Sequence, residues 1–192
     1  MSVRVATKQL SWSQSQTMSV CLATMGALAL ALLSQVKIYL PGTPVPITLQ
    51  VLAVIMLGGL LGPRLGLAAV LEYLLLGICG LPVFAGWTSG IAILTGATAG
   101  YLFAFPVAAV LCGMVYSRFA AQSYARRVAG ATLMGIVGTI VIYLGGWLWL
   151  ANWGHLALSK AFTLGVTPFI IADILKVSVA ATGLALRRKG TA

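Results

Sequence analysis

Long apolar runs dominate this chain, and short polar or Pro/Gly-rich segments separate them. A helix needs about 20 mostly apolar residues to cross about 30 Å of hydrocarbon. The first run is long enough, and the chain stays apolar after it, which argues against a cleaved signal peptide. The pattern predicts an all-α, polytopic membrane protein with six transmembrane helices, at residues 17–35, 48–61, 65–79, 91–116, 128–150 and 167–186.

This pattern also divides the chain into three parts. A polar N-terminal segment at 1–16 precedes a six-helix membrane domain at 17–186, and a basic tail at 187–192 follows it. Within the membrane domain we expect five connections between the helices, and Pro and Gly interrupt regular helix at several of them. They are the Pro-rich loop at 36–47, a tight turn at 62–64, an irregular segment at 80–90, a loop that holds Arg118, Arg126 and Arg127, and a loop at 151–167. Thr167 is expected to cap the last helix, with Pro168 at its first position.

Composition excludes an ordinary soluble enzyme. Hydrophobic residues make up 60% of the 192 residues and charged residues 7%, against about 45–50% and about 25% in soluble domains. Twelve Lys and Arg face two acids, for a net charge of +10. Nucleic-acid binding requires such charge on a solvated face, whereas here the cations lie between apolar runs. A lipid bilayer is therefore the expected partner, and nucleic acid is not.

The distribution of cations predicts the orientation in the membrane. Loops that hold Lys and Arg tend to stay in the cytoplasm. One side holds only Lys37 and Lys160, and the other holds both terminal segments and the loops after the second and fourth helices. Both termini are thus predicted to be cytoplasmic. The Pro-rich loop, the 80–90 segment and the 151–167 loop then share the outer face, where a ligand site would open.

No catalytic or cofactor-binding pattern is present. The chain has one histidine, His155, and neither HExxH nor the phosphate-binding GxxxxGK[ST] occurs. The three cysteines are far apart and match no zinc or CxxC spacing. We expect a protein that is not an enzyme and that holds no metal or cofactor.

The strongest candidates for ligand binding are Asp173 and Lys176. They lie three residues apart, hence on one face of the last helix, and roughly 8 and 12 Å inside its start. Charged residues at such depth usually mark a functional site. The alternative is an ion pair that only joins helices. Glu72, the other intramembrane charge, could pair with Lys176, face Arg64 or contact a ligand, and the sequence leaves this open.

Two further features allow two interpretations each. Trp87, Thr88 and Ser89 offer a flat ring beside two hydroxyls, as a ligand site would, or as an interfacial aromatic belt would. Ala23, Ala27 and Ala31 form a stripe of small residues along the first helix. Such stripes let helices pack closely, either within the chain or against a partner subunit.

Five segments together resemble the BioY family, the biotin-binding S components of energy-coupling factor (ECF) transporters. They extend over most of the chain in the order PGTPVPITLQ (41–50), GGLLGPRLG (58–66), YLLLGICGLPVFAG (73–86), GATAGYLFAF (96–105) and PFIIADILK (168–176). The chain departs from the usual family pattern at 97–100, at Trp87 and at Ala172. The resemblance implies a six-helix fold, both termini inside, and a first outer loop that closes over the ligand.

The resemblance also implies a set of site residues. The acid and lysine of the last-helix motif fall on Asp173 and Lys176. The Trp87–Ser89 triplet and the matching motifs supply the remaining candidate ligand contacts, which are Thr43, Val45, Phe84, Gly86, Trp87, Thr88, Ser89 and Tyr101. The alanine stripe corresponds to a docking surface for the transmembrane coupling subunit.

The expected function is therefore a high-affinity biotin-binding subunit of an ECF-type vitamin transporter, in the cell membrane of a prokaryote. Such a subunit has no energy source of its own, so it implies a coupling membrane protein and ATP-binding cassette ATPases as partners. Biotin suits a small polar set within apolar walls. The alternatives are an S component for a different small vitamin, or a membrane scaffold subunit without transport function.

Overall fold

The computed structural model describes the backbone of residues 2–186 and the side chains of residues 15–186. Helices account for most of it, together with one short antiparallel hairpin and several irregular connections. In chain order the elements are α1 (Ser2–Ser34), β1 (Lys37–Ile38), β2 (Ile47–Thr48), α2 (Gln50–Ile78), the 3-10 helix η1 (Ile91–Thr95), α3 (Ala99–Ser117), α4 (Tyr124–Trp153), α5 (Leu158–Gly165), the 3-10 helix η2 (Thr167–Phe169) and α6 (Ile170–Leu186).

Five helical segments within residues 15–186 are long and apolar enough to cross a membrane: Ser15–Ser34, Gln50–Ile78, Ala99–Ser117, Tyr124–Trp153 and Leu158–Leu186. Their outer faces carry large exposed apolar side chains, such as Ile136, Ile140 and Leu144 at four-residue spacing on α4. A contiguous apolar face of this kind is unfavourable in water and favourable in lipid. The chain is therefore a multi-pass helical membrane protein.

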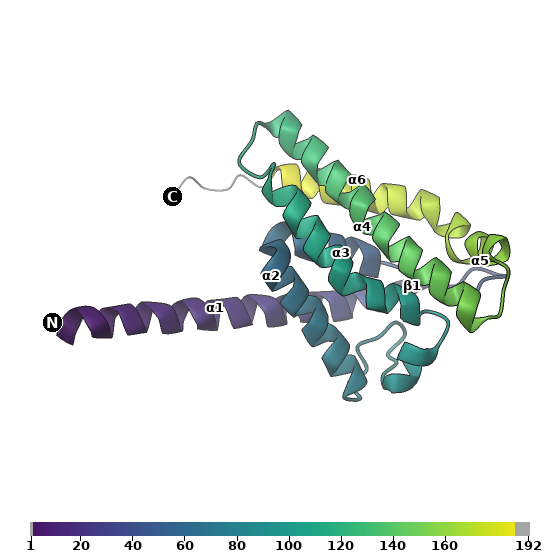
Figure 1. Ribbon diagram of the computed structural model, residues 1–192, viewed down its shortest axis with the longest axis horizontal. Helices are drawn as coiled ribbons and strands as arrows, with labels where there is room; N and C mark the ends of the chain where they lie inside the picture. Colours follow the sequence, from purple (N-terminus) through teal and green to yellow (C-terminus); the bar gives the residue numbers. More distant parts are fainter. Residues whose placement is uncertain (1, 187–192) are drawn as a thin grey trace.

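The turn predicted at 62–64 is a break of one residue. Gly62 takes φ +80° and ψ 178°, a conformation open in practice to glycine, and the helix resumes at once with Pro63. Proline is well tolerated there because the first turn of a helix has no acceptor for its missing N–H. A Cβ on Gly113 of α3 would lie 2.4 Å from the Pro63 nitrogen, so α3 packs directly on the break. The two arms of α2, 50–61 and 63–78, point in different directions (Figure 1).

The first predicted span was confirmed, and the start of the fourth was wrong. The span predicted at 17–35 matches the apolar segment Ser15–Ser34. The helix α1 that contains it is continuous from Ser2, since Ser and Gln permit helix even though they are polar. The fourth helix does not begin at 91, because Gly96 has an extended backbone and separates η1 from α3. Residues 91–98 are therefore an irregular approach to the bundle rather than part of a span.

The predicted loop at 151–167 was also wrong in part. It contains the helix α5, which buries Ala161 and Gly165 and exposes Leu158 and Phe162. The last helix begins at Ile170, after the short η2, and Thr167 forms no side-chain capping bond. The basic tail predicted at 187–192 lies outside the described residues, as do the side chains of residues 1–14.

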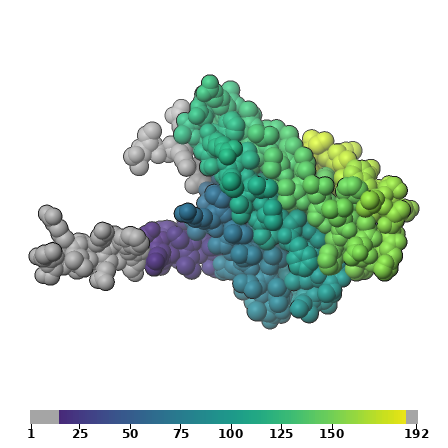
Figure 2. All heavy atoms as spheres, viewed as in Figure 1, coloured from purple at the N-terminus to yellow at the C-terminus, as the bar shows by residue number. Residues whose placement is uncertain are grey.

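Small residues bring the helices together. A Cβ on Gly58 of α2 would lie 2.5 Å from the carbonyl of Ala109 on α3, and one on Gly100 of α3 would lie 2.3 Å from the carbonyl of Gly145 on α4. Close backbone approach of this kind is typical of helix packing in membranes. α3 thus lies between α2 and α4, α6 packs against α4 and α2, and α1 packs against α2. In the space-filling view the helices form one continuous body from which α1 emerges (Figure 2).

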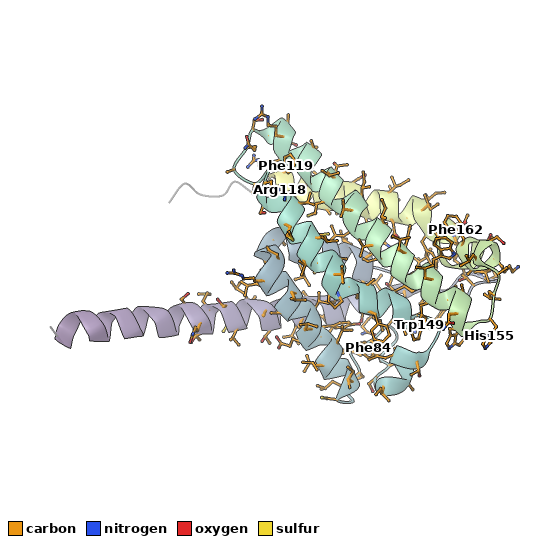
Figure 3. All side chains as sticks on the ribbon, viewed as in Figure 1. Phe84, Arg118, Phe119, Trp149, His155 and Phe162 are labelled. Carbon is orange, nitrogen blue, oxygen red and sulfur yellow. The ribbon has the colours of Figure 1, made fainter. Side chains whose placement is uncertain are left out.

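The two ends of the bundle differ. The start of α1, the connection between α3 and α4 and the end of α6 lie toward one side of the molecule, and α5 lies at the other (Figure 1). Arg118 and Phe119 mark the first end, whereas Phe84, Trp149, His155 and Phe162 lie toward the second (Figure 3). The irregular segments that the sequence assigned to a common face are therefore gathered at the end that carries α5.

Candidate ligand-binding site

A cavity of about 240 Å³ lies at this second end, between the Pro-rich loop, the 80–98 region and the helices α2, α3, α4 and α6. Its walls are mainly apolar, with a small number of polar groups, which is the usual form of a small-molecule site. The lining residues are Tyr39, Pro44, Val45, Pro46, Thr48, Gln50, Val51, Ala85, Thr88, Ile93, Thr98, Tyr101, Leu102, Phe105, Ile142, Tyr143, Phe169, Asp173 and Lys176.

The charged wall of the cavity belongs to α6. Asp173 and Lys176 are 3% and 7% exposed, and Lys176 Nζ forms an ion pair with Asp173 Oδ1. The second carboxylate oxygen, Oδ2, accepts a hydrogen bond from the Tyr143 hydroxyl of α4 at 2.6 Å. Because burial of a lone charge is costly, each group of the pair compensates the charge of the other beside an apolar interior. Asp173 thus has each oxygen held by a donor, and both charged side chains still line the cavity.

An uncharged polar group projects from the start of α2. Gln50, 7% exposed, donates through Nε2 to the Tyr73 hydroxyl at 2.7 Å. Its Oε1 accepts from the Thr48 hydroxyl at 3.0 Å. These two bonds fix the orientation of the amide, and Gln50 and Thr48 both line the cavity. Tyr73 is fully buried behind them and serves to position Gln50.

The Pro-rich loop covers one side of the cavity and is fixed both at its base and near its tip. Its base is the β1–β2 hairpin, in which Lys37 pairs with Thr48 and Ile38 with Ile47. Near its tip, the Thr43 hydroxyl donates to the Leu164 carbonyl of α5 at 2.7 Å. The same oxygen accepts from the backbone N–H of Val45 at 3.2 Å. The loop is thereby joined to α5 across the cavity.

The 80–90 segment is held in place by the end of α1. Gln35 donates to the Phe84 carbonyl at 3.2 Å and accepts from the Trp87 backbone N–H at 2.8 Å. Ser34 donates to the Val83 carbonyl at 2.7 Å. These bonds supply partners for a backbone that is not in regular structure and cannot satisfy itself. They also allow Trp87 to keep a left-handed φ of 61°.

Five of the ten side chains predicted to contact a ligand line this one cavity: Val45, Thr88, Tyr101, Asp173 and Lys176. Tyr101 also donates its hydroxyl to the Gly165 carbonyl at 2.6 Å, which ties α3 to the segment before α6.

The other five residues predicted to contact a ligand do not line the cavity. Phe84 is buried edge-on against Tyr73, with ring centroids 5.5 Å apart. Thr43 braces the Pro-rich loop. Gly86, Trp87 and Ser89 lie in the adjacent segment, with the Trp87 side chain 67% exposed.

Sequence reasoning missed several cavity residues, above all Gln50 and Tyr143. Gln50 lies within the PITLQ motif and could have been singled out as an amide at the start of an apolar run. Nothing distinguished Tyr143 from other tyrosines in the spans, since its role depends on the position of α4 beside α6.

The sequence left the partner of Glu72 open, and the structure does not pair it with Lys176. Lys176 pairs with Asp173, and within residues 15–186 Glu72 forms no ion pair with Arg64 or any other cation. Glu72 is half-buried on the second arm of α2 and does not line the cavity. The same described region contains no group of three or more His, Cys, Asp and Glu side chains placed to hold a metal.

The alanine stripe faces the interior of the chain. Ala23, Ala27 and Ala31 are 6%, 0% and 9% exposed and belong to the core that α1 shares with its neighbours. A Cβ on Gly26, beside them, would lie 2.9 Å from the Cβ of Ala69 on α2. In this conformation the stripe provides close packing within the chain.

The fold and the cavity define a multi-pass helical membrane protein with a ligand-sized chamber at one end of its bundle. Comparison with known proteins supports this class and also identifies the family. The sequence matches the BioY family over residues 6–191, and the chain belongs to that family.

Named relatives extend over most of the chain. A protein of Pyrococcus horikoshii described as a probable biotin transporter BioY is 44% identical over 71% of this chain and 76% of its own length. The biotin transporter BioY2 of Lactococcus lactis subsp. cremoris is 40% identical over 88% of this chain and 90% of its own. Among solved structures, the S-component for biotin from an ECF-type ABC transporter superimposes with a TM-score of 0.81. It covers 90% of this chain and 91% of that one at 24% identity, which supports the fold.

Proposed function

We propose that this chain is the biotin-binding membrane subunit, or S component, of an ECF-type vitamin uptake transporter in the cell membrane of a prokaryote. The observation that carries the proposal is the cavity with one charged wall on α6 and one amide on α2, enclosed by apolar helices. Relatives named as biotin transporters cover most of the chain, so the same ligand is the natural first candidate.

The chemistry of the cavity suits biotin. Its ureido ring has two N–H donors and a carbonyl, its thiophane ring is apolar, and its valerate chain ends in a carboxylate. Asp173 accepts from ring N–H groups, Lys176 and Gln50 donate to the ring carbonyl, and the apolar walls enclose the thiophane ring. These roles use groups that are already oriented by Tyr143, Tyr73 and Thr48, which lowers the cost of ordering them on binding.

The proposal includes six spans with both termini in the cytoplasm. The arms of α2, 50–61 and 63–78, are separated by the Gly62 break and count as two spans. The cations of the described loops favour this orientation, because Arg118 and Arg126 lie in the α3–α4 region and Arg64 at the α2 break. The cavity then opens on the outer side, where the vitamin arrives.

Uptake against a gradient requires energy, and the chain contains no nucleotide-binding motif. We propose that a transmembrane coupling subunit and a pair of ATP-binding cassette ATPases supply it. For Ala23, Ala27 and Ala31 to contact such a partner, α1 has to separate from α2, because the stripe is buried between them in this conformation.

Calorimetry on the purified protein in detergent tests the ligand assignment. Biotin is expected to bind at nanomolar to low-micromolar strength, and a panel of other small vitamins is expected not to compete with labelled biotin. A competing vitamin with higher affinity would make this an S component for that vitamin. No heat and no competition with any vitamin, on folded protein, would leave only the scaffold interpretation.

A further inference from the structure

Lys37 lies at the edge of the cavity. It is half-buried on β1, and its ammonium donates to the Tyr39 hydroxyl at 3.0 Å and lies 4.8 Å from the centroid of that ring. Tyr39 itself lines the cavity. The positive charge is therefore attached to a wall residue of the chamber, at the base of the Pro-rich loop.

A second segment holds the same ammonium from the other side. Gly86 has φ +79°, and a Cβ added there would lie 1.8 Å from Lys37 Nζ. The ammonium thus rests directly on the Gly86 backbone, next to Ala85, which lines the cavity. A glycine is needed at 86 both for its backbone conformation and for the space that Lys37 occupies. The two outer segments together fix one cation at the rim.

This cation has no carboxylate partner within residues 15–186. The whole chain has two acids: Asp173 pairs with Lys176, and Glu72 forms no ion pair in the part of the chain with described side chains. An ammonium that has no carboxylate nearby to balance its charge attracts an anionic ligand group through Coulomb interaction. Lys37 is therefore an anion site at the entrance of a chamber whose inner charged pair is already neutral.

We infer that Lys37 binds the carboxylate of the ligand and thereby makes the protein selective for a free acid over its neutral derivatives. The inference rests on the proposed function and deepens it, because it orients biotin. The ureido ring meets Asp173, Lys176 and Gln50, and the valerate chain extends to the rim formed by Tyr39, Lys37 and Gly86.

Two ligands and two variants test this orientation. Biotin and biotinamide share both rings and differ in the charge at the end of the chain. Lys37→Gln removes the cation while retaining a donor for Tyr39. Lys160→Gln is the matched control, because Lys160 is an exposed lysine of α5 outside the cavity lining. Affinities are measured by calorimetry in a non-ionic detergent and again in phosphatidylcholine nanodiscs.

The unaltered protein is expected to prefer biotin over biotinamide by about tenfold or more, as a charge-assisted hydrogen bond provides. Lys37→Gln should abolish that preference by lowering the affinity for biotin alone, in detergent and in nanodiscs. Lys160→Gln should leave the affinities for both ligands unchanged. Equal affinity of the unaltered protein for the two ligands overturns the inference and leaves the proposed function intact. An equal loss of affinity for both ligands in Lys37→Gln also overturns the inference and leaves the proposed function intact. An effect of Lys37→Gln confined to nanodiscs also overturns it and assigns Lys37 to lipid phosphate. If the unaltered protein binds neither ligand, the proposed function itself fails.

Discussion

Replacing Asp173 and Lys176 singly and together separates a ligand-binding role from a purely structural one. The variants are Asp173→Asn, Lys176→Met and the double variant. Each single change leaves the partner as an unpaired charge in a site where both side chains are at least nine-tenths buried. The double change removes both charges at once and keeps the approximate volume of both side chains.

The structure sets the expected sizes. Breaking a fully buried ion pair costs about 3–5 kcal/mol. Here the remaining charge still borders the cavity, which water can enter, so we expect each single variant to lose about 2 kcal/mol of stability. For Asp173→Asn, Tyr143 keeps an oxygen acceptor, which limits the loss further. The double variant should lose less than the sum of the two, since no unpaired charge is left, with a coupling of about 1–3 kcal/mol.

Ligand affinity should behave differently from stability. Each single variant is expected to weaken biotin binding by at least about tenfold, or about 1.4 kcal/mol. The double variant should not recover the affinity, because it lacks both groups that we propose to contact the ligand. Thermal unfolding in detergent measures the stability of each variant, and calorimetry at a temperature where all variants are folded measures the affinity for biotin. A double variant that regains both stability and affinity would refute the binding role and leave only a helix-joining pair.

Three further predictions concern packing around the site. Gly146→Ala should destabilise the fold by several kcal/mol, because its Cβ would lie 2.1 Å from the Tyr101 ring, whereas Gly183→Ala, with its nearest neighbour at 3.9 Å, should be nearly neutral in thermal unfolding. Tyr101→Phe should lower stability by about 1 kcal/mol and should also lower the affinity for the ligand, because it releases the segment before α6 from α3. Unchanged affinity with reduced stability would limit the tyrosine to a structural role. Gly86→Ala should reduce biotin affinity by displacing Lys37. Gly90→Ala, at φ +90° with open space around it, should cost about 1–3 kcal/mol of stability through backbone strain and leave affinity unchanged.

Much of the helical architecture could be predicted from the sequence because lipid permits few alternatives. A backbone surrounded by hydrocarbon must satisfy its own hydrogen bonds, so a long apolar run becomes a helix. The break near Gly62 was also predictable, from glycine and proline in succession. Boundaries outside hydrocarbon were less so: the polar start of α1 and the amphipathic α5 both form helix where local composition favoured loop. There the outcome depends on propensity and tertiary contacts rather than on hydropathy.

The candidate site was predictable where charge was involved. Asp173 and Lys176 stand out because an ionised group in a span is costly, and both line the cavity. Gln50 and Tyr143 did not stand out, because amides and phenols occur in apolar helices without special cost when a partner is near. Their partners, Tyr73 and Asp173, are 23 and 30 residues away in sequence. Only the packing of the helices brings them together.

The orientation that we propose for biotin follows from the arrangement of charge around the chamber, which places no net charge inside the bundle. Asp173 and Lys176 neutralise each other inside the bundle, so the interior presents donors and acceptors without net charge. Lys37, which has no carboxylate partner within residues 15–186, lies at the rim beside Tyr39. A ligand with a neutral polar head and an acidic tail matches this distribution if its head enters first. A ligand with the opposite arrangement would place its charge beside Asp173, where repulsion and desolvation act together.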